Sequence, residues 1–184
     1  MAVALFISTT DLKKNTLVSG SVDVNKFIFY IKIAQQLHIE RILGTKLYER
    51  LQTAITAQTL TANESTLIND WIQDALIHYA MAEYLPFAAF QIKNGGVFKH
   101  TSETSANADK AEVDFLVQKE RNFAEYYTKR LVTYLCNNST LFPEYITNVD
   151  EDIRPTKIIN YTGGWFFDDQ ITKDELRQIR DLEV

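Results

Sequence analysis

The sequence is poor in the residues that cross-link a chain or interrupt its helices. It has one cysteine, three prolines and six glycines among 184 residues. A lone cysteine excludes a framework of disulfide bonds and fits a reducing compartment. Glycine and proline together fall well below their usual share of about 12%. An all-β sandwich needs many turns, so this shortage favours long helices and predicts an all-α fold class.

The sequence also lacks an excess of positive charge and a long apolar run. Lys and Arg number 19 against 24 Asp and Glu, which gives a net charge of −5. Proteins that bind duplex DNA usually carry a basic surface, so the charge balance opposes that function. The longest apolar stretch, residues 79–90, contains Glu83 and Pro86 and is shorter than the roughly 20 residues that a bilayer span needs. We therefore expect no membrane association and an intracellular protein.

Motifs that carry catalysis or bind cofactors are missing. The histidines His38, His78 and His100 fall on different predicted elements, and the chain has no Cys-x-x-Cys pair, Walker loop or dinucleotide-binding glycine motif. Glu83 is the one acid within an apolar stretch, and no second carboxylate accompanies it. We interpret His78 as a structural histidine and Cys136 as a buried small hydrophobe. The sequence thus predicts no catalytic residue, no cofactor and no metal.

Apolar periodicity and capping signals predict four main helices, near residues 23–38, 39–57, 63–85 and 108–136. A short turn before them starts at Ser8, and Thr61 with Glu64 forms a capping box. Gly44 either lies within the second helix or divides it in two, and Pro86 ends or kinks the third. The stripe expected to pack the last helix consists of Phe115, Leu116, Phe123, Tyr127, Leu131, Tyr134 and Leu135.

The first of these helices is apolar nearly all round. Such a helix is either buried on most sides or meets another chain with one face. Aromatic and β-branched residues dominate 27–33 and would also suit a strand. We prefer a helix, because the pattern continues to Leu37 without a turn signal.

A short β-hairpin is predicted over residues 90–100, since Asn-Gly between two short apolar runs is a strong hairpin signal. We expect its loop to touch a neighbouring subunit or ring, or else its aromatic residues to cover the domain's own core. The candidate interface residues here are Phe90, Asn94, Gly95, Gly96 and Phe98.

The last part of the chain, residues 148–184, differs in character from the helical domain, residues 1–147. It holds nine acids and five bases, which is 5 − 9 = −4 of net charge. Within it, Trp165, Phe166 and Phe167 follow a glycine pair, and Thr172 with Glu175 caps a short helix. Large apolar side chains on so polar a segment suit an interface. We predict an extended C-terminal arm that docks on another chain through these three aromatics, the alternative being that they cover the domain's own core.

Two stretches resemble the opening helices of phage head–tail connector (adaptor) proteins. They are Tyr30-Ile31-x-Ile33-Ala34-Gln35 and His38-Ile39-x-x-Ile42-Leu43-Gly44-Thr45-x-Leu47-Tyr48-x-x-Leu51. Two later stretches, Asn94-Gly95-Gly96-Val97 and Tyr134-Leu135-Cys136-Asn137-Asn138-Ser139, are similar to connector-like proteins in phages of gut bacteria, including crAss-like phages. The resemblance covers roughly residues 8–142.

This resemblance implies a four-helix connector-type domain that forms a homo-oligomeric ring of twelve copies beneath the portal. Portal protein and tail or further ring proteins would be its partners, and genome DNA would pass through without sequence-specific binding. The protein would be a virion component of the head–tail junction, assembled in the host cytoplasm, and not an enzyme. A rival hypothesis is a small intracellular helical enzyme or regulator with a pocket around Trp71, Tyr79 and Tyr134.

Overall fold

The computed structural model describes residues 4–16, 18, 24–88, 90–93, 96–99, 109–147 and 153–157. Most of these residues are helical, as the all-α class requires. The helices are α1 (Thr9–Asn15), α2 (Val24–Ala34), α3 (Glu40–Leu43), α4 (Thr45–Ala57), α5 (Ala62–Thr66), α6 (Gln73–Tyr84), α7 (Lys110–Asn137) and α8 (Pro143–Thr147). Two π-helical turns (Gln35–Ile39 and Leu67–Ile72) and a 3-10 turn (Leu85–Phe87) connect some of them.

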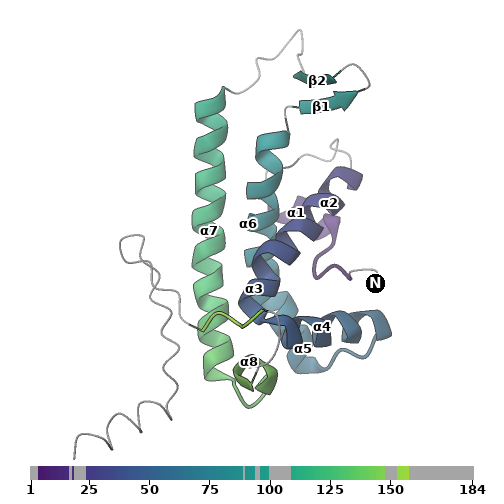
Figure 1. Ribbon diagram of the computed structural model, residues 1–184, viewed down its shortest axis with the longest axis vertical. Coiled ribbons are helices and arrows are strands. Elements are labelled where there is room, and N and C mark those ends of the chain that lie inside the picture. The colour runs from purple at the N-terminus through teal and green to yellow at the C-terminus, as the bar shows by residue number, and fades with distance from the viewer. Residues whose placement is uncertain are drawn as a thin grey trace, which may run out of the picture.

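Helix α6 is the centre of the core. It lies between α2 and α7 (Figure 1) and buries residues on several sides, among them Ala75, Leu76 and Ala80. Small alanine side chains let the flanking helices approach closely. The flanking helices contribute a buried set of their own, which includes Phe27, Ile31, Leu131 and Leu135.

The break near the start of the domain falls at Gly44. Helix α2 runs through a π-helical turn into α3, without the interruption that we predicted between residues 38 and 39. Gly44 has φ 76° and ψ 159°, a region of backbone space that only glycine adopts readily. The prediction of one helix over 39–57 is therefore wrong: its first residues end the preceding helix, and α4 is separate. The alternative strand at 27–33 is also wrong, since these residues lie within α2.

Local signals at the other helix ends work as predicted. Ser8 and Thr61 each accept a hydrogen bond from the backbone three residues later, and both form complete capping boxes. Helix α6 ends at Tyr84, and Pro86 lies in the 3-10 turn that follows. Asn138 caps the end of α7. Each of these ends depends only on residues within one or two turns.

A buried glutamine attaches the N-terminal segment to the helices. The Gln35 side chain has no exposed surface. Its Oε1 accepts a hydrogen bond from the Phe6 amide at 2.8 Å, and its Nε2 donates to the Ala4 carbonyl at 2.9 Å. Because both polar ends of the amide are satisfied, its burial costs little.

An ion-pair network joins α4, α5 and α8. Arg50 Nε donates to Glu64 Oε1 at 2.7 Å, and Arg50 Nη1 donates to Glu144 Oε2 at 2.8 Å. Glu64 is 3% exposed. Burial raises the pKa of Glu64, but hydrogen bonds from Thr61 and Arg50 outweigh burial and hold this pKa below its usual value.

The described part of the predicted arm, residues 153–157, lies against the helical domain. The Thr45 amide donates to the Ile153 carbonyl at 3.1 Å, and the Thr156 amide donates to the Ile42 carbonyl at 3.2 Å. Pro155 is buried, and the Tyr145 hydroxyl donates to the Thr156 carbonyl. The predicted domain boundary after residue 147 is therefore too early for this stretch, because its backbone satisfies groups at the α3–α4 break.

Strands β1 (Phe90–Lys93) and β2 (Gly96–Lys99) form an antiparallel pair. In the register of this pair, Phe90 is the partner of Lys99, Gln91 of Phe98 and Lys93 of Gly96. The pair lies beyond the end of α6, near the start of α7 (Figure 1).

Candidate interaction surfaces

The predicted interface residues divide into a described and an undescribed group. Phe90 begins β1 and is exposed, and Gly96 and Phe98 lie in β2. The structure thus brings these three residues into one two-stranded unit. The others, Asn94, Gly95, Trp165, Phe166 and Phe167, lie outside the described residues.

The part of α7 up to Tyr126 carries an exposed apolar surface, one edge of which touches α6, where the Phe123 ring lies 5.2 Å from that of His78. This surface consists of Phe115, Leu116, Phe123 and Tyr126, and we call it the α7 patch. The Phe115 and Tyr126 side chains are each 60% exposed. Lys119 lies among them, with its ammonium 5.5 Å from the centre of the Phe115 ring.

For three members of the α7 patch, the sequence interpretation is wrong. Phe115, Leu116 and Phe123 were expected in the packed stripe of this helix. The face that packs instead carries Ala124, Leu131 and Leu135, which are buried, and Thr128, whose hydroxyl bonds to Tyr79 on α6. Residues 115 and 116 lie outside that face because helix rotation places them away from residues 124, 128 and 131, and Phe123 lies at its edge, with its ring 5.2 Å from that of His78 on α6.

A second apolar surface lies on α2. Ile28 and Phe29 are exposed, and we call them the α2 patch. The Phe29 ring packs edge-on against Tyr30 at 5.3 Å, and Tyr30 stacks on the exposed Phe87 at 5.8 Å. The α2 patch and the α7 patch belong to helices on opposite sides of α6 (Figure 1). Among the described residues, α2 therefore leaves part of its apolar surface exposed.

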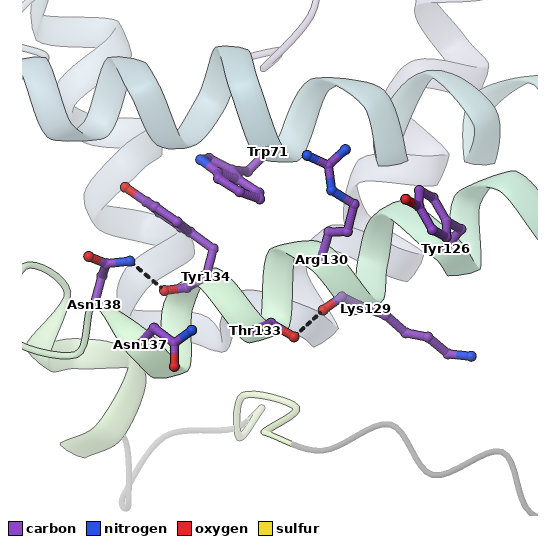
Figure 2. A pocket seen from close by; sticks show the side chains of 8 residues that line it. All are labelled: Trp71, Tyr126, Lys129, Arg130, Thr133, Tyr134, Asn137 and Asn138. Carbon is purple, nitrogen blue, oxygen red and sulfur yellow. Dashed lines mark hydrogen bonds between the residues drawn. The ribbon is translucent and has the colours of Figure 1, made fainter.

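A groove of about 450 Å³ lies beside the second half of α7. We call it the Trp71 groove; Figure 2 shows its lining residues, Trp71, Tyr126, Lys129, Arg130, Thr133, Tyr134, Asn137 and Asn138. Trp71 comes from the π-helical turn before α6, and the remaining side chains come from α7 and its cap. The spacing of Tyr126, Arg130, Tyr134 and Asn138 by four residues is the sequence signal that could have identified this face.

Aromatic stacking and one cation organise the groove. The Trp71 and Tyr134 rings stack with centres 4.4 Å apart and planes 15° apart. The Arg130 guanidinium lies 5.2 Å from the centre of the Trp71 ring and 5.8 Å from that of Tyr127. Such cation–π contacts hold the arginine in place while leaving its N–H donors available for an anion. The groove lining contains two cations and no acid.

The sequence alternative of a pocket around Trp71, Tyr79 and Tyr134 is met in part. Trp71 and Tyr134 share the groove, but Tyr79 is not in its lining. The Tyr79 ring stacks on His38 at 4.0 Å instead, which places it between α6 and the π-helical turn at 35–39.

Two described histidines hold helices together. His38 Nε2 lies 3.2 Å from Glu83 Oε1, and His78 Nδ1 lies 2.7 Å from Glu120 Oε2. Burial lowers the pKa of His38, and the Glu83 carboxylate opposes that effect. Glu83, the one acid within the apolar stretch, is thus engaged by His38. His78, predicted to be a structural histidine, has its ring stacked on that of Tyr127.

Cys136 differs from its predicted environment. Its side chain is exposed rather than buried, and its Sγ lies 3.5 Å from the Lys157 carbonyl, to which it donates. The residue falls on the outer side of α7 because Leu131 and Leu135 occupy the inner side.

Among the described residues, no group of three or more His, Cys, Asp or Glu side chains could hold a metal ion. No helix within the same residues combines the length and the apolar character of a membrane span.

Residues 39–154 match the model of a family of unknown function, DUF6712. Since the match extends over more than half of the 184 residues, the chain belongs to this family. No curated protein and no solved structure matches the chain significantly.

Proposed function

We propose that this member of the DUF6712 family is a structural subunit of a phage head–tail connector, an adaptor ring that docks beneath the portal and lines the DNA passage. The observation that carries the proposal is the presence of two exposed apolar patches on helices at opposite sides of α6. Exposed apolar surface of this kind marks association sites. A single patch would serve a two-fold dimer, whereas two different patches suit head-to-tail contacts.

Head-to-tail contacts generate a closed ring when the rotation between copies divides a full turn. In the proposed ring of twelve copies, the α2 patch of one copy covers the α7 patch of the next. The exposed Phe29 on one side and Phe115 on the other are the anchors of this contact. Full burial of an aromatic side chain removes about 150–250 Å² from water, and more than half of that area is still exposed at Phe29 and Phe115, so these side chains can contribute strongly to an interface.

Other features support the same function. A net charge of −5 repels the phosphates of DNA that passes through a ring, so the genome does not adhere. His38 and His78 are engaged in helix packing, and this supports a structural rather than an enzymatic protein.

The hairpin and the C-terminal arm extend the proposed contacts. Phe90, Gly96 and Phe98 lie in the strand pair beyond the end of α6, and the exposed Phe90 is available to an adjacent ring or to the portal. The arm after residue 157 contacts another chain through Trp165, Phe166 and Phe167. The assembled protein is a virion component of the head–tail junction, and assembly takes place in the host cytoplasm.

Two single variants test the head-to-tail contact. Phe29→Glu blocks the α2 patch and Phe115→Glu blocks the α7 patch, and both positions are too exposed to affect folding strongly. In mass photometry at physiological salt, the unmodified chain should give ring-sized particles, while each variant alone should give monomers. An equimolar mixture of the two variants should give dimers, because one intact contact remains between them. Thr53→Glu, at an exposed position on α4, is the matched control and should leave the rings intact.

Three results would contradict the proposal. A chain that stays monomeric at every concentration would remove its basis. Rings that survive both substitutions would show that the patches are not the contact. Dimers that only Phe115→Glu dissolves would indicate a two-fold dimer through the α7 patch.

The second candidate is a small intracellular enzyme or regulator that binds a ligand in the Trp71 groove. The groove volume of about 450 Å³ lies within the range of small-molecule sites, and this observation favours the candidate. A monomer whose melting temperature rises with a small molecule, and no longer rises after Trp71→Ala, would support it over the connector.

A further inference from the structure

The Trp71 groove has the chemistry of a site for a segment that combines aromatic and acidic residues. The stacked Trp71 and Tyr134 rings contribute apolar lining, and Tyr126 lies exposed at the other end of the groove. Arg130 is fixed over Trp71 with a planar, permanently charged head group. A carboxylate next to an aromatic side chain would satisfy both features at once.

This chain carries such a segment outside its described residues. Residues 158–184 hold six acids and three bases, a net charge of 3 − 6 = −3. The densest part is Trp165-Phe166-Phe167-Asp168-Asp169, where three aromatic residues directly precede two carboxylates. The negative charge of this segment is opposite to that of Lys129 and Arg130, the two cations in the groove lining.

The described chain ends next to the groove. Lys157 is held at the last turn of α7, because its carbonyl accepts a hydrogen bond from Cys136. Asn137, the next residue of α7, already lines the groove. From Lys157 to Trp165 an extended chain spans up to about 28 Å, roughly the width of a small domain. The aromatic stretch can therefore cross one subunit boundary.

We propose that the Trp71 groove of each copy receives Trp165–Asp169 from the neighbouring copy in the ring. This inference rests on the connector function, which brings the copies together. Tyr126 belongs both to the α7 patch and to the groove lining, so a copy seated on the α7 patch lies alongside the groove. The three aromatic side chains pack on the exposed Tyr126 ring and along the stacked Trp71 and Tyr134 pair, and the Asp168 and Asp169 carboxylates pair with Arg130.

Disulfide trapping in the full chain tests which copy donates the segment. With Cys136→Ser as background, Phe166→Cys is combined with either Thr133→Cys or Asn137→Cys, and the assembled protein is oxidised with diamide. Transfer between copies predicts a ladder of covalent multimers on a non-reducing gel for at least one pair. Phe166→Cys with Thr53→Cys, at an exposed position on α4 away from the groove lining, is the control and should remain monomeric.

A binding measurement tests the chemistry of the groove separately. A fluorescein-labelled peptide of residues 158–184 is titrated with a full chain in which Trp165, Phe166 and Phe167 are replaced by serine. Arg130→Glu in that chain, or Trp165→Ala in the peptide, should weaken binding at least about tenfold. Arg121→Glu makes the same charge change at an exposed position of α7 outside the groove lining, and should alter binding less than about twofold.

The outcomes separate this inference from the connector function. Intact rings that give no ladder with either pair, or a bond within one chain only, would overturn the exchange between copies and leave the ring. Equal loss of peptide binding with Arg130→Glu and Arg121→Glu would show nonspecific attraction and overturn the groove as the acceptor. A chain that never assembles would contradict the connector function itself, and the exchange with it.

Discussion

The two halves of α7 use their apolar side chains differently. From residue 124 onward the helix buries Ala124, Leu131 and Leu135 in the core beside α6. Before residue 124 no side chain of α7 is buried, although Phe115 and Leu116 are as apolar as the residues of the second half. One helix thus contains a half that the domain needs for its own stability and a half whose outer surface the domain does not use. Substitutions in the two halves should separate folding from assembly.

The largest expected effect comes from the core half. Leu131→Ala removes a fully buried side chain and leaves a cavity, so we expect the free energy of unfolding to fall by about 2–5 kcal/mol. Phe115→Ala in the exposed half should change the free energy of unfolding by less than about 0.5 kcal/mol. Urea unfolding followed by circular dichroism measures both variants. Similar losses at the two positions would erase the distinction between the halves.

A smaller effect on the free energy of unfolding is expected at Gly44, between α3 and α4. Gly44→Ala introduces a Cβ at φ 76° and ψ 159°, so we expect a loss of about 1–3 kcal/mol. The matched control is Thr53→Ala, at an exposed site on α4, which should be neutral or slightly stabilising. A Gly44→Ala variant as stable as the unmodified chain would mean that this backbone turn is not required.

The ion-pair network should give a pH-dependent effect. Hydrogen bonds from Thr61 and Arg50 hold the pKa of Glu64 below its unfolded value of about 4.3. The charged form is favoured in the folded state, so its stabilising contribution is complete above pH 4.3 and is lost as the pH falls through the folded pKa. Glu64→Gln should cost about 1–2 kcal/mol at pH 7, with the difference from the unmodified chain shrinking toward pH 3. Melting temperatures between pH 3 and pH 7 measure this difference, with the exposed Glu49→Gln as control. If the melting temperatures of Glu64→Gln and the unmodified chain differ by the same amount at every pH, the loss comes from packing and not from the charge of Glu64.

The smallest effect is expected at the exposed cysteine. Cys136→Ser keeps a donor for the Lys157 carbonyl and disturbs no buried contact, so stability should change by less than about 0.5 kcal/mol. Urea unfolding checks this. A loss above 1 kcal/mol would show that the contact at Lys157 holds residues 153–157 against the domain.

Helix ends and turns were predictable because their signals are local. Ser8, Thr61 and Pro86 act through backbone groups within one turn, and their positions in the structure agree with the sequence interpretation. Gly44 was recognised as a site where the helix could divide, but its neighbours alone left two possibilities open. The tertiary structure decides between them, because Gly44 takes a non-helical conformation there and separates α3 from α4.

The candidate site was less predictable, because it depends on rotation and on distant partners. The apolar residues of α7 occur on more than one face, with Phe115 nearly opposite the buried Leu131, and the sequence does not say which face meets α6. The Trp71 groove appears only when the turn before α6 packs beside the last turns of α7 and stacks Trp71 on Tyr134.

Composition and short-range pattern alone determined that this chain is helical and acidic, and where several of its helices begin and end. Such features follow from backbone hydrogen bonding and side-chain volume within a few residues. The tertiary structure alone decided which apolar residues are left outside the core. A helix face becomes surface or interior only through the helices packed against it, and here α6 covers Leu131 while leaving Phe115 exposed.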